Sequence, residues 1–379
     1  MSRHEAALRE LDAAGAFSGA PWIREAMDAV RREAFVPDVI WRDDGDVYTR
    51  VDRRTDPAGW SAVVDGRGPV VTQVDDGVGA EHGEVATSSI SDRLAVANFL
   101  STLDVRPGQR VWEVGTGSGW TAALLAHRVG PRGRVVTVEI DRALADAARA
   151  RLSPWAETVR VVAGDGEDSA SAAGVDGVDW RWDRVHATAA VTRHIPQAWV
   201  ERTVPGAVLV VPFSPPFESG SLLRLVAKEH GVASGRFVKS VAFMPLRGHR
   251  NLGHDVFDEI RAAHPAHDST PVDWHLAGLS ADGNHTQALA LKLPDVHRST
   301  GAGGAKWWLH DNKDSWALVD DTADTGHALQ GGPRKLWNEA AAIIAWQDDA
   351  EVHAYDFGIT VEPDAQWAWA GTPNERWRM

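Results

Sequence analysis

The chain has 379 residues, which is long enough for two domains, and its 44% hydrophobic and 24% charged residues are typical of a globular protein. It has no basic-apolar leader and no run of about 18 apolar residues, so we expect neither a signal peptide nor a membrane span. The absence of cysteine excludes disulfides and thiolate metal sites and is consistent with the cytoplasm. A net charge of −14 argues against nucleic-acid binding.

The charge is concentrated in the last third of the chain. Residues 251–379 contain 20 acidic and 9 basic residues, so this part either has a solvated acidic surface or binds a basic partner segment. It also holds 9 of the 18 tryptophans, which form either a domain core or an interface. Histidines such as His264, His267 and His310 lack the spacing of a ligand set, so we expect no metal.

The N-terminal part is expected to be helical and irregular. The apolar spacing predicts short helices over 5–14 and 22–34, and β-prone runs follow at 62–64 and 70–74. Hydroxyl residues and Asp92 precede an apolar stretch, so a further helix is predicted to open within 87–92 and to end near Leu103.

The centre of the sequence is a strand, a glycine turn and a helix. The apolar run 111–114 ends at Gly115, Gly117 and Gly119, and helix-period residues follow from 121 to 129. Glycine permits a sharp turn and close approach of a ligand, and the following helix directs free N–H groups at that turn. This order indicates the first crossover of a doubly wound α/β sheet.

Two acidic residues support nucleoside binding at this turn. The next strand, 134–140, carries Glu139 at its end, where such folds hold the ribose hydroxyls, although a plain strand-end acid is the alternative. A third strand, 159–162, leads to Asp165 on a second glycine turn. The Gly-x-Gly-x-Gly spacing, with a second acid suited to an adenine amino group, favours S-adenosylmethionine over a dinucleotide.

The remaining pattern predicts an α/β fold with a second domain. Strands and helices alternate as far as Pro212, and a closing pair at 222–228 and 238–245 gives a Rossmann-like, seven-stranded sheet. We predict an N-terminal region over 1–84 packed on the catalytic domain 85–250, and an α+β domain over 251–379 for docking a substrate or partner. This last domain has an expected helix after Pro333 and expected strands at 287–293, 306–309, 316–319, 358–361 and 366–370.

Several motifs follow one another in the order of a known enzyme family. They include Arg31-Arg32-Glu33-Ala34-Phe35-Val36-Pro37, Ile90-Ser91, Val138-Glu139-Ile140, Gly164-Asp165-Gly166 and Phe243-Met244-Pro245-Leu246. On these motifs, residues 31–43 and 85–250 resemble the protein-L-isoaspartate O-methyltransferases. The run Thr87 to Ser91 and the Trp-rich tail look like an actinobacterial long form associated with ribosomal peptide (lanthipeptide or graspetide) biosynthesis.

The resemblance implies a set of residues for S-adenosylmethionine. Gly115, Thr116, Gly117 and Ser118 would wrap its methionine portion, Glu139 would hold the ribose, and Asp165 with Gly166 would hold the adenine. Glu113 and Ile140 complete the implied cofactor set.

The resemblance also implies residues for the substrate. Ser91 takes the place of the serine that orients the substrate carboxylate, although it would otherwise cap its helix; Ser88 and Ser89 are extra hydroxyls. The family continues Ser-x-Pro where this chain has Arg93, which either clamps a carboxylate or pairs with Asp92. Asp75 and Asp76 precede the serine motif near the expected substrate entrance. The expected catalytic residues are Ser91, Ser89 and Ser88, and the expected substrate-binding residues are Arg93, Asp75, Asp76 and Thr188.

Methyl transfer to an ionised aspartate needs no general base, so the lack of an evident catalytic dyad agrees with the resemblance. The first function expected is carboxyl methylation of an aspartate in a modified, macrocyclic ribosomal peptide, leading through aspartimide to isoaspartate. The alternatives are repair of isoaspartyl residues in aged proteins and a non-catalytic, cofactor-binding scaffold. A peptide or protein is the expected partner, without nucleic acid or membrane, and the sequence does not fix the oligomeric state.

Overall fold

The computed structural model describes residues 3–45, 47–168, 181–217, 220–250, 256–281, 283–322 and 326–379. Contacts divide the chain into two compact units. The first comprises Met1–Ala189, Pro196–Val211 and Val226–Gly231, and the second comprises Ala190–Ile195, Pro212–Leu225 and Val232–Met379. Among the described residues, no helix is both long and apolar enough to cross a membrane.

The first unit contains the predicted parallel α/β sheet. Its strands lie in the order β10-β9-β6-β7-β8, and each neighbouring pair is parallel. Most residues of β6, β7 and β9 are buried, as expected for a parallel sheet, which helices cover on both faces. Its elements are α4 (Arg93–Leu103), β6 (Arg110–Val114), α5 (Trp120–Val129), β7 (Arg134–Glu139), α6 (Arg142–Arg151), β8 (Val159–Ala163), β9 (Trp182–Ala187), α8 (Gln197–Glu201) and β10 (Thr203–Phe213).

The same sheet continues beyond the seven predicted strands. After β11 (Ser221–Ala227) and β12 (Ala233–Ser240), it adds β18 (Phe357–Glu362), β19 (Ala365–Ala370) and β20 (Arg376–Arg378), giving ten strands. The sequence correctly predicts strands at 358–361 and 366–370. From the sequence, both strands are expected in the separate domain 251–379. In the structure, β18 pairs antiparallel with β12. The predicted domains 1–84, 85–250 and 251–379 therefore stay a proposal.

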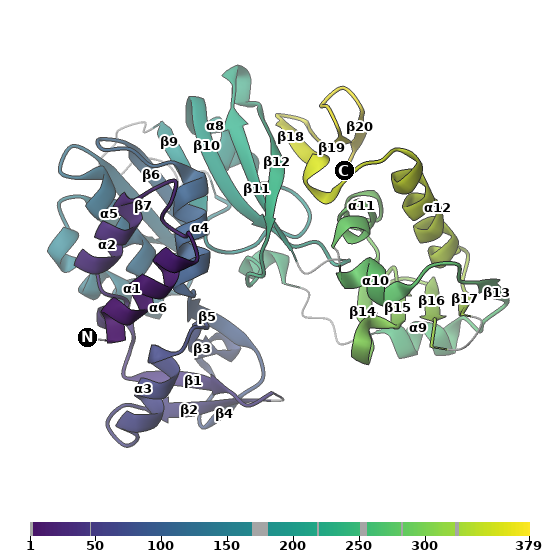
Figure 1. The fold of residues 1–379 in the computed structure, drawn as a ribbon, viewed down its shortest axis with the longest axis horizontal. Helices are drawn as coiled ribbons and strands as arrows, with labels where there is room; N and C mark the ends of the chain where they lie inside the picture. The colour runs from purple at the N-terminus through teal and green to yellow at the C-terminus, as the bar shows by residue number, and fades with distance from the viewer. Residues whose placement is uncertain are drawn as a thin grey trace. The chain divides into compact units, whose positions relative to one another are not determined.

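The N-terminal part contains a small antiparallel sheet as well as helices (Figure 1). Its strand order is β4-β2-β1-β3-β5. This sheet matters for the site because β5 leads directly into α4. The elements are α1 (Arg3–Ala13), α2 (Trp22–Ala29), β1 (Val39–Asp43), β2 (Tyr48–Asp52), α3 (Pro57–Asp65), β3 (Val70–Val74), β4 (His82–Gly83) and β5 (Ala86–Ile90).

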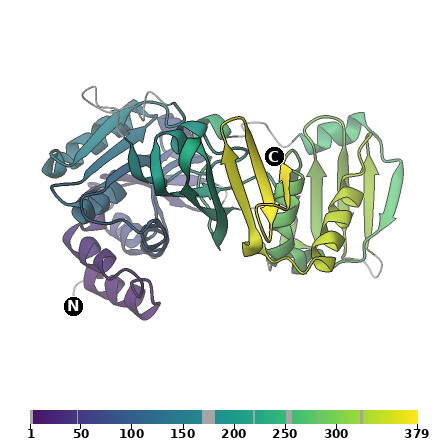
Figure 2. The same cartoon turned by 90° about the horizontal axis from the view of Figure 1, so that it is seen from above.

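The C-terminal part contains an antiparallel sheet in the order β13-β17-β16-β15-β14 (Figure 2). Along β16, Trp316 packs with Phe257 of α9, while Ala317 and Val319 pack in a core with Trp337 of α12. This alternation shows that both faces of the sheet are covered. Its elements are α9 (Phe257–Ala263), β13 (Asp268–Pro271), α10 (Leu276–Ala281), α11 (Asn284–Lys292), β14 (His297–Thr300), β15 (Lys306–His310), β16 (Trp316–Asp320), β17 (His327–Gly331) and α12 (Leu336–Asp349).

Several local predictions are wrong. The strand expected at 238–245 instead spans Ala233–Ser240 as β12. Residues 62–64 lie in α3, because Asp56 caps that helix through the Gly59 N–H and Pro57 starts it. Residues 287–293 lie mostly in α11, where alanine and leucine favour a helix over the apparent alternation. Residues 86–90 form a strand, and the predicted helix begins only at Arg93.

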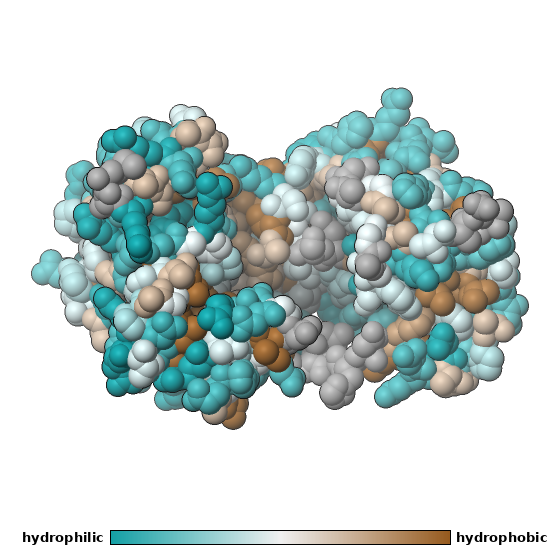
Figure 3. Space-filling model, turned by 60° about the horizontal axis from the view of Figure 1, so that its bottom comes forward, coloured by the Kyte–Doolittle hydropathy of each residue, from teal (hydrophilic) through white to brown (hydrophobic). Residues whose placement is uncertain are grey.

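Hydrophilic residues cover most of the face drawn in Figure 3, with small hydrophobic patches between them. Among the described residues, the large hydrophobic side chains that stay exposed include Val47, Val78 and Val85, which lie in or beside the N-terminal sheet. Val78 is 83% exposed. The turn between β3 and β5 therefore presents apolar side chains to solvent.

Candidate active site

The glycine turn after β6 has the backbone that its sequence requires. Gly115, Gly117 and Gly119 have φ values of 96°, 53° and 93°, in the region that favours glycine. A Cβ on Gly115 would lie 2.3 Å from the Thr188 hydroxyl oxygen, so this close approach also requires glycine. Gly119 is the N-cap of α5, so the first N–H groups of that helix lie at the turn.

Glu139 lies at the end of β7 and is bonded to the turn. Its Oε2 accepts the Gly117 N–H at 2.8 Å, and its Oε1 accepts the Asp141 N–H at 3.1 Å. Two backbone donors hold the carboxylate at one place beside the glycine turn. A fixed acid in this position suits the ribose hydroxyls of a nucleoside.

The adenine side of the predicted site lies beyond β7 and β8. Ile140 is 40% exposed, which leaves an apolar surface next to Glu139 that suits the face of a purine. Asp165 is exposed and accepts the Glu167 N–H at 2.9 Å. Gly166 is buried, and a Cβ there would lie 2.4 Å from a methyl carbon of Val114. These features fit a nucleoside cofactor such as S-adenosylmethionine.

Glu113 lies on β6, two residues before the glycine turn, and is completely buried. Its Oε2 accepts a hydrogen bond of 2.6 Å from Thr137, whose hydroxyl is 2.7 Å from the Thr116 hydroxyl. Burial raises the pKa of Glu113 to about 8. Burial likewise lowers the pKa of His186, its neighbour on β9, to about 4. Glu113 is therefore linked to Thr116 through Thr137, and its direct contact with a cofactor stays a prediction.

The serine strand β5 lies against the glycine turn. A Cβ on Gly117 would lie 3.7 Å from both the Ser88 hydroxyl and the Ser89 carbonyl oxygen. Ser88 is buried and accepts a hydrogen bond of 3.2 Å from Thr72 on β3. The structure thus brings Ser88 and Ser89 to the glycine turn. Ser118, the last residue of the predicted set, is buried in the same turn.

Ser91 does not cap α4. Asp92 is the N-cap and accepts the Ala95 N–H at 2.9 Å, while the Ser91 hydroxyl has no hydrogen bond to any residue that the structure describes. Arg93 is 9% exposed and donates to Glu33 at 2.6 Å. Its partner is therefore Glu33 rather than Asp92, and its predicted contact with a substrate carboxylate stays a prediction.

The other predicted substrate residues have structural partners. Asp75 accepts the N–H groups of Glu84 and Val85, which closes the turn between β3 and β5. Asp76, which is exposed, donates its N–H to Thr87. Thr188 donates to the carbonyl oxygen of Gly115 and so supports the glycine turn.

Sequence reasoning missed two polar residues that hold the serine strand. Arg32 is 1% exposed and donates to the Ile90 carbonyl at 3.0 Å and to the Gly68 carbonyl at 3.1 Å. Gln73 donates to Asp141 at 3.1 Å. The motif that contains Arg32 is visible in the sequence, but Gln73 lies in an ordinary strand pattern without a signal.

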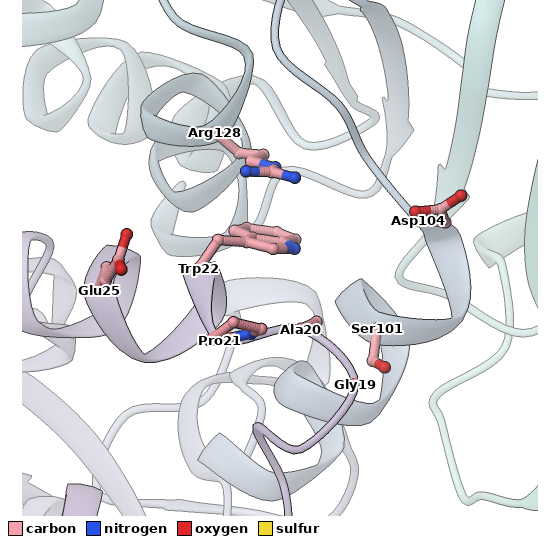
Figure 4. A pocket seen from close by; sticks show the side chains of 8 residues that line it. All are labelled: Gly19, Ala20, Pro21, Trp22, Glu25, Ser101, Asp104 and Arg128. Carbon is pink, nitrogen blue, oxygen red and sulfur yellow. The ribbon is translucent and has the colours of Figure 1, made fainter.

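A surface pocket of about 370 Å³ in the first unit lies away from these residues (Figure 4). Arg128 stacks over Trp22 there, 4.8 Å from the ring centroid. Arg128 is near the end of α5, whereas the glycine turn is at its start, roughly 15 Å away by the rise of a ten-residue helix. The pocket contains none of the predicted site residues. It is lined by Gly19, Ala20, Pro21, Trp22, Glu25, Ser101, Asp104 and Arg128.

Comparisons with known proteins agree with this geometry. Residues 78–251 match the family model described as protein-L-isoaspartate(D-aspartate) O-methyltransferase. Enzymes of this family are carboxyl methyltransferases that use S-adenosylmethionine. A relative named protein-L-isoaspartate O-methyltransferase, from Methylorubrum extorquens (strain PA1), is 34% identical over 225 residues, covering 59% of this chain and 79% of the relative.

Two further similarities extend this result. A protein of the same name from Nitrobacter winogradskyi is 36% identical over 164 residues, covering 43% of this chain and 70% of the relative. A solved structure named protein-L-isoaspartate O-methyltransferase has a TM-score of 0.56 at 18% identity, over 97% of this chain and 100% of that chain, and so shows a similar fold. This chain belongs to the protein-L-isoaspartate O-methyltransferase family.

Proposed function

We propose that this chain transfers the methyl group of S-adenosylmethionine to the carboxylate of an aspartate or isoaspartate residue in a peptide. The observation that carries the proposal is that three features of the site lie next to one another. The Gly117 turn, the Glu139 carboxylate bonded to it, and the serine strand β5 lie together. An acid suited to ribose hydroxyls and a serine strand, both beside one glycine turn, are consistent with transfer from a nucleoside cofactor to a peptide.

Positioning is the main contribution of the protein to this reaction. When bound, S-adenosylmethionine supplies an electrophilic methyl group, and the attacking carboxylate is already ionised at neutral pH. Glu139 and the turn 115–118 would hold the cofactor, and the hydroxyl of Ser91 would donate to one oxygen of the substrate carboxylate. Alignment of two reactants contributes on the order of 7–11 kcal/mol to lowering a barrier, so no side chain needs to remove a proton.

For the substrate, we propose an aspartate in a modified, macrocyclic ribosomal peptide. Two features support this choice. Strands β1 to β3 precede residue 78, where the family match begins, and they carry β5 against the cofactor turn. Ser88 and Ser89 add hydroxyl or carbonyl groups at that turn. The strands that support β5 on the peptide side of the site thus lie outside the family match.

Repair of isoaspartyl residues is the second candidate. The matched relatives are named for O-methylation of isoaspartate, the step with which such repair begins. The solved structure with a similar fold covers 97% of this chain, so the fold of the tail also occurs in a protein with that name. The tail therefore does not argue against repair. In both candidates the methyl ester is attacked by the following backbone nitrogen, methanol leaves, and the resulting aspartimide hydrolyses to aspartate or isoaspartate.

Mass spectrometry of two peptides separates the candidates. The enzyme and S-adenosylmethionine are incubated with a linear isoaspartyl peptide and with a cyclised, aspartate-containing precursor. Methylation of the cyclised peptide alone, followed by net loss of water, supports the biosynthetic role. Preferential methylation of the linear peptide establishes repair instead. Cofactor binding without methylation of either peptide, or of a wider isoaspartyl peptide library, would revive the scaffold hypothesis and contradict the proposed function.

A further inference from the structure

A chain of hydrogen bonds joins the two sides of the site through Gln73. Gln73 Nε2 donates to Asp141 Oδ2 at 3.1 Å, and the Thr87 hydroxyl donates to Gln73 Oε1 at 3.0 Å. Thr87 also accepts the Asp76 N–H at 3.1 Å. On the other side, the Asp141 N–H donates to Glu139. The chain therefore runs from the turn after β3 to the acid proposed to hold the cofactor ribose.

The backbone is shaped to aim Gln73 at Asp141. The pairing of β3 with β5 shifts register twice, between Val71 and Gln73 and again between Gln73 and Val74. Such bulges turn a side chain away from the regular alternation of a strand, and they are frequent next to active sites. Gln73 is 9% exposed, and both ends of its amide are bonded. A buried amide with its donor and acceptor both satisfied is held in one orientation.

We propose that Gln73 is a positioning residue that couples cofactor binding to peptide binding. A cofactor that orders Glu139 also orders Asp141, because the Asp141 N–H is bonded to that carboxylate. Because Gln73 is bonded to both Asp141 and Thr87, fixing Asp141 also restrains Thr87 on β5. This strand places Ser88 and Ser89 against the glycine turn. The peptide side of the inference rests on the proposed function, whereas the contact with the cofactor acid does not.

The coupling is measured by calorimetry with S-adenosylhomocysteine and a peptide that the enzyme methylates. By linkage, each ligand tightens the other by the same factor. We expect wild-type protein to bind the peptide several-fold more tightly, about fivefold or more, when S-adenosylhomocysteine is present. Gln73→Glu places a carboxylate against Asp141. It is expected to weaken S-adenosylhomocysteine binding about tenfold and to abolish the coupling.

A second substitution that restores the hydrogen bond distinguishes a positioning role of Gln73 from a general loss of structure. In Gln73→Glu with Asp141→Asn, donor and acceptor exchange places, so the bond and the coupling are expected to return. Asparagine is also a good N-cap, which keeps the Asp141 cap on α6. Gln109→Glu is the matched control, because among the described residues the Gln109 side-chain amide is bonded only through its oxygen, which accepts the Arg106 N–H. If a thermal melting curve shows that the Gln73→Glu protein does not fold, the Gln73→Met variant replaces it in the same titrations. Methionine has a similar length to glutamine and no charge, and we expect this variant to lose the coupling as well.

Three results would overturn the inference. They are unchanged coupling in the Gln73 variant, equal losses in the Gln109 control, and failure of the double variant to recover. A wild-type protein that binds S-adenosylhomocysteine but methylates no peptide would instead contradict the proposed function. In that case the tenfold loss of S-adenosylhomocysteine affinity in Gln73→Glu still tests whether Gln73 positions the cofactor acid.

Discussion

Replacing Glu113 by glutamine should change how the stability of the protein depends on pH. Glu113 is completely buried, and of the residues that the structure describes only Thr137 is bonded to its carboxylate. Burial raises its pKa from the ordinary 4.5 to about 8 in the folded protein. The folded state therefore keeps a proton that the unfolded chain releases above pH 4.5. The contribution of this group to stability is complete below that pH and is lost as pH rises toward about 8.

The size of this loss follows from the shift. Each pH unit inside the window costs about 1.4 kcal/mol, so the wild-type protein should lose about 3 kcal/mol from this group between about pH 5 and about pH 7. A glutamine side chain at this position would keep the acceptor for Thr137 and cannot ionise. We therefore expect Glu113→Gln to gain about 3 kcal/mol relative to wild type over the same interval, whatever its stability at pH 5.

Urea unfolding followed by tryptophan fluorescence measures this difference at each pH. Glu259→Gln, which removes an exposed carboxylate on α9, is the control and should leave the pH dependence as in wild type. Parallel stability profiles for wild type and Glu113→Gln would refute the reasoning, because they would mean that the folded protein ionises Glu113 without cost.

Three further changes test other parts of the site. His186→Phe should keep the packing on Phe99 and remove the stability loss that wild type shows as pH falls from 6.5 to about 4, as measured by unfolding at each pH. Gly115→Ala places a Cβ 2.3 Å from Thr188 Oγ1 at a positive φ, so S-adenosylhomocysteine affinity by calorimetry should fall more than about tenfold; unchanged affinity would contradict the assigned turn. Ser91→Ala should lower kcat about tenfold to a thousandfold without raising KM for S-adenosylmethionine. If KM for S-adenosylmethionine rose by as large a factor as kcat fell, Ser91 would have a structural role instead.

The sequence predicts the site better at its cofactor side than at its peptide side. The glycines, Glu139 and Asp165 follow strand ends, and a parallel sheet brings such ends to one edge, so their proximity could be expected. Gln73 lies 68 positions from Asp141, and their contact depends on a bulge that leaves no pattern in a single sequence. The strand 86–90 resembles a helix start in the sequence because serine and threonine also serve as caps, whereas Asp92 alone performs that role.

The pairing of β12 with β18 has a consequence for synthesis and for engineering. Arg236 pairs with Gly358, about 120 residues later, so the edge of β12 has no neighbour on that side until β18 is made. An uncovered strand edge is a template for association with other chains. A shortened protein that ends near residue 250 would keep this edge permanently open. Such a fragment should be prone to aggregation even though it contains every residue of the candidate active site, and an internal deletion that retains β18 to β20 would be the better way to remove the sheet formed by β13 to β17.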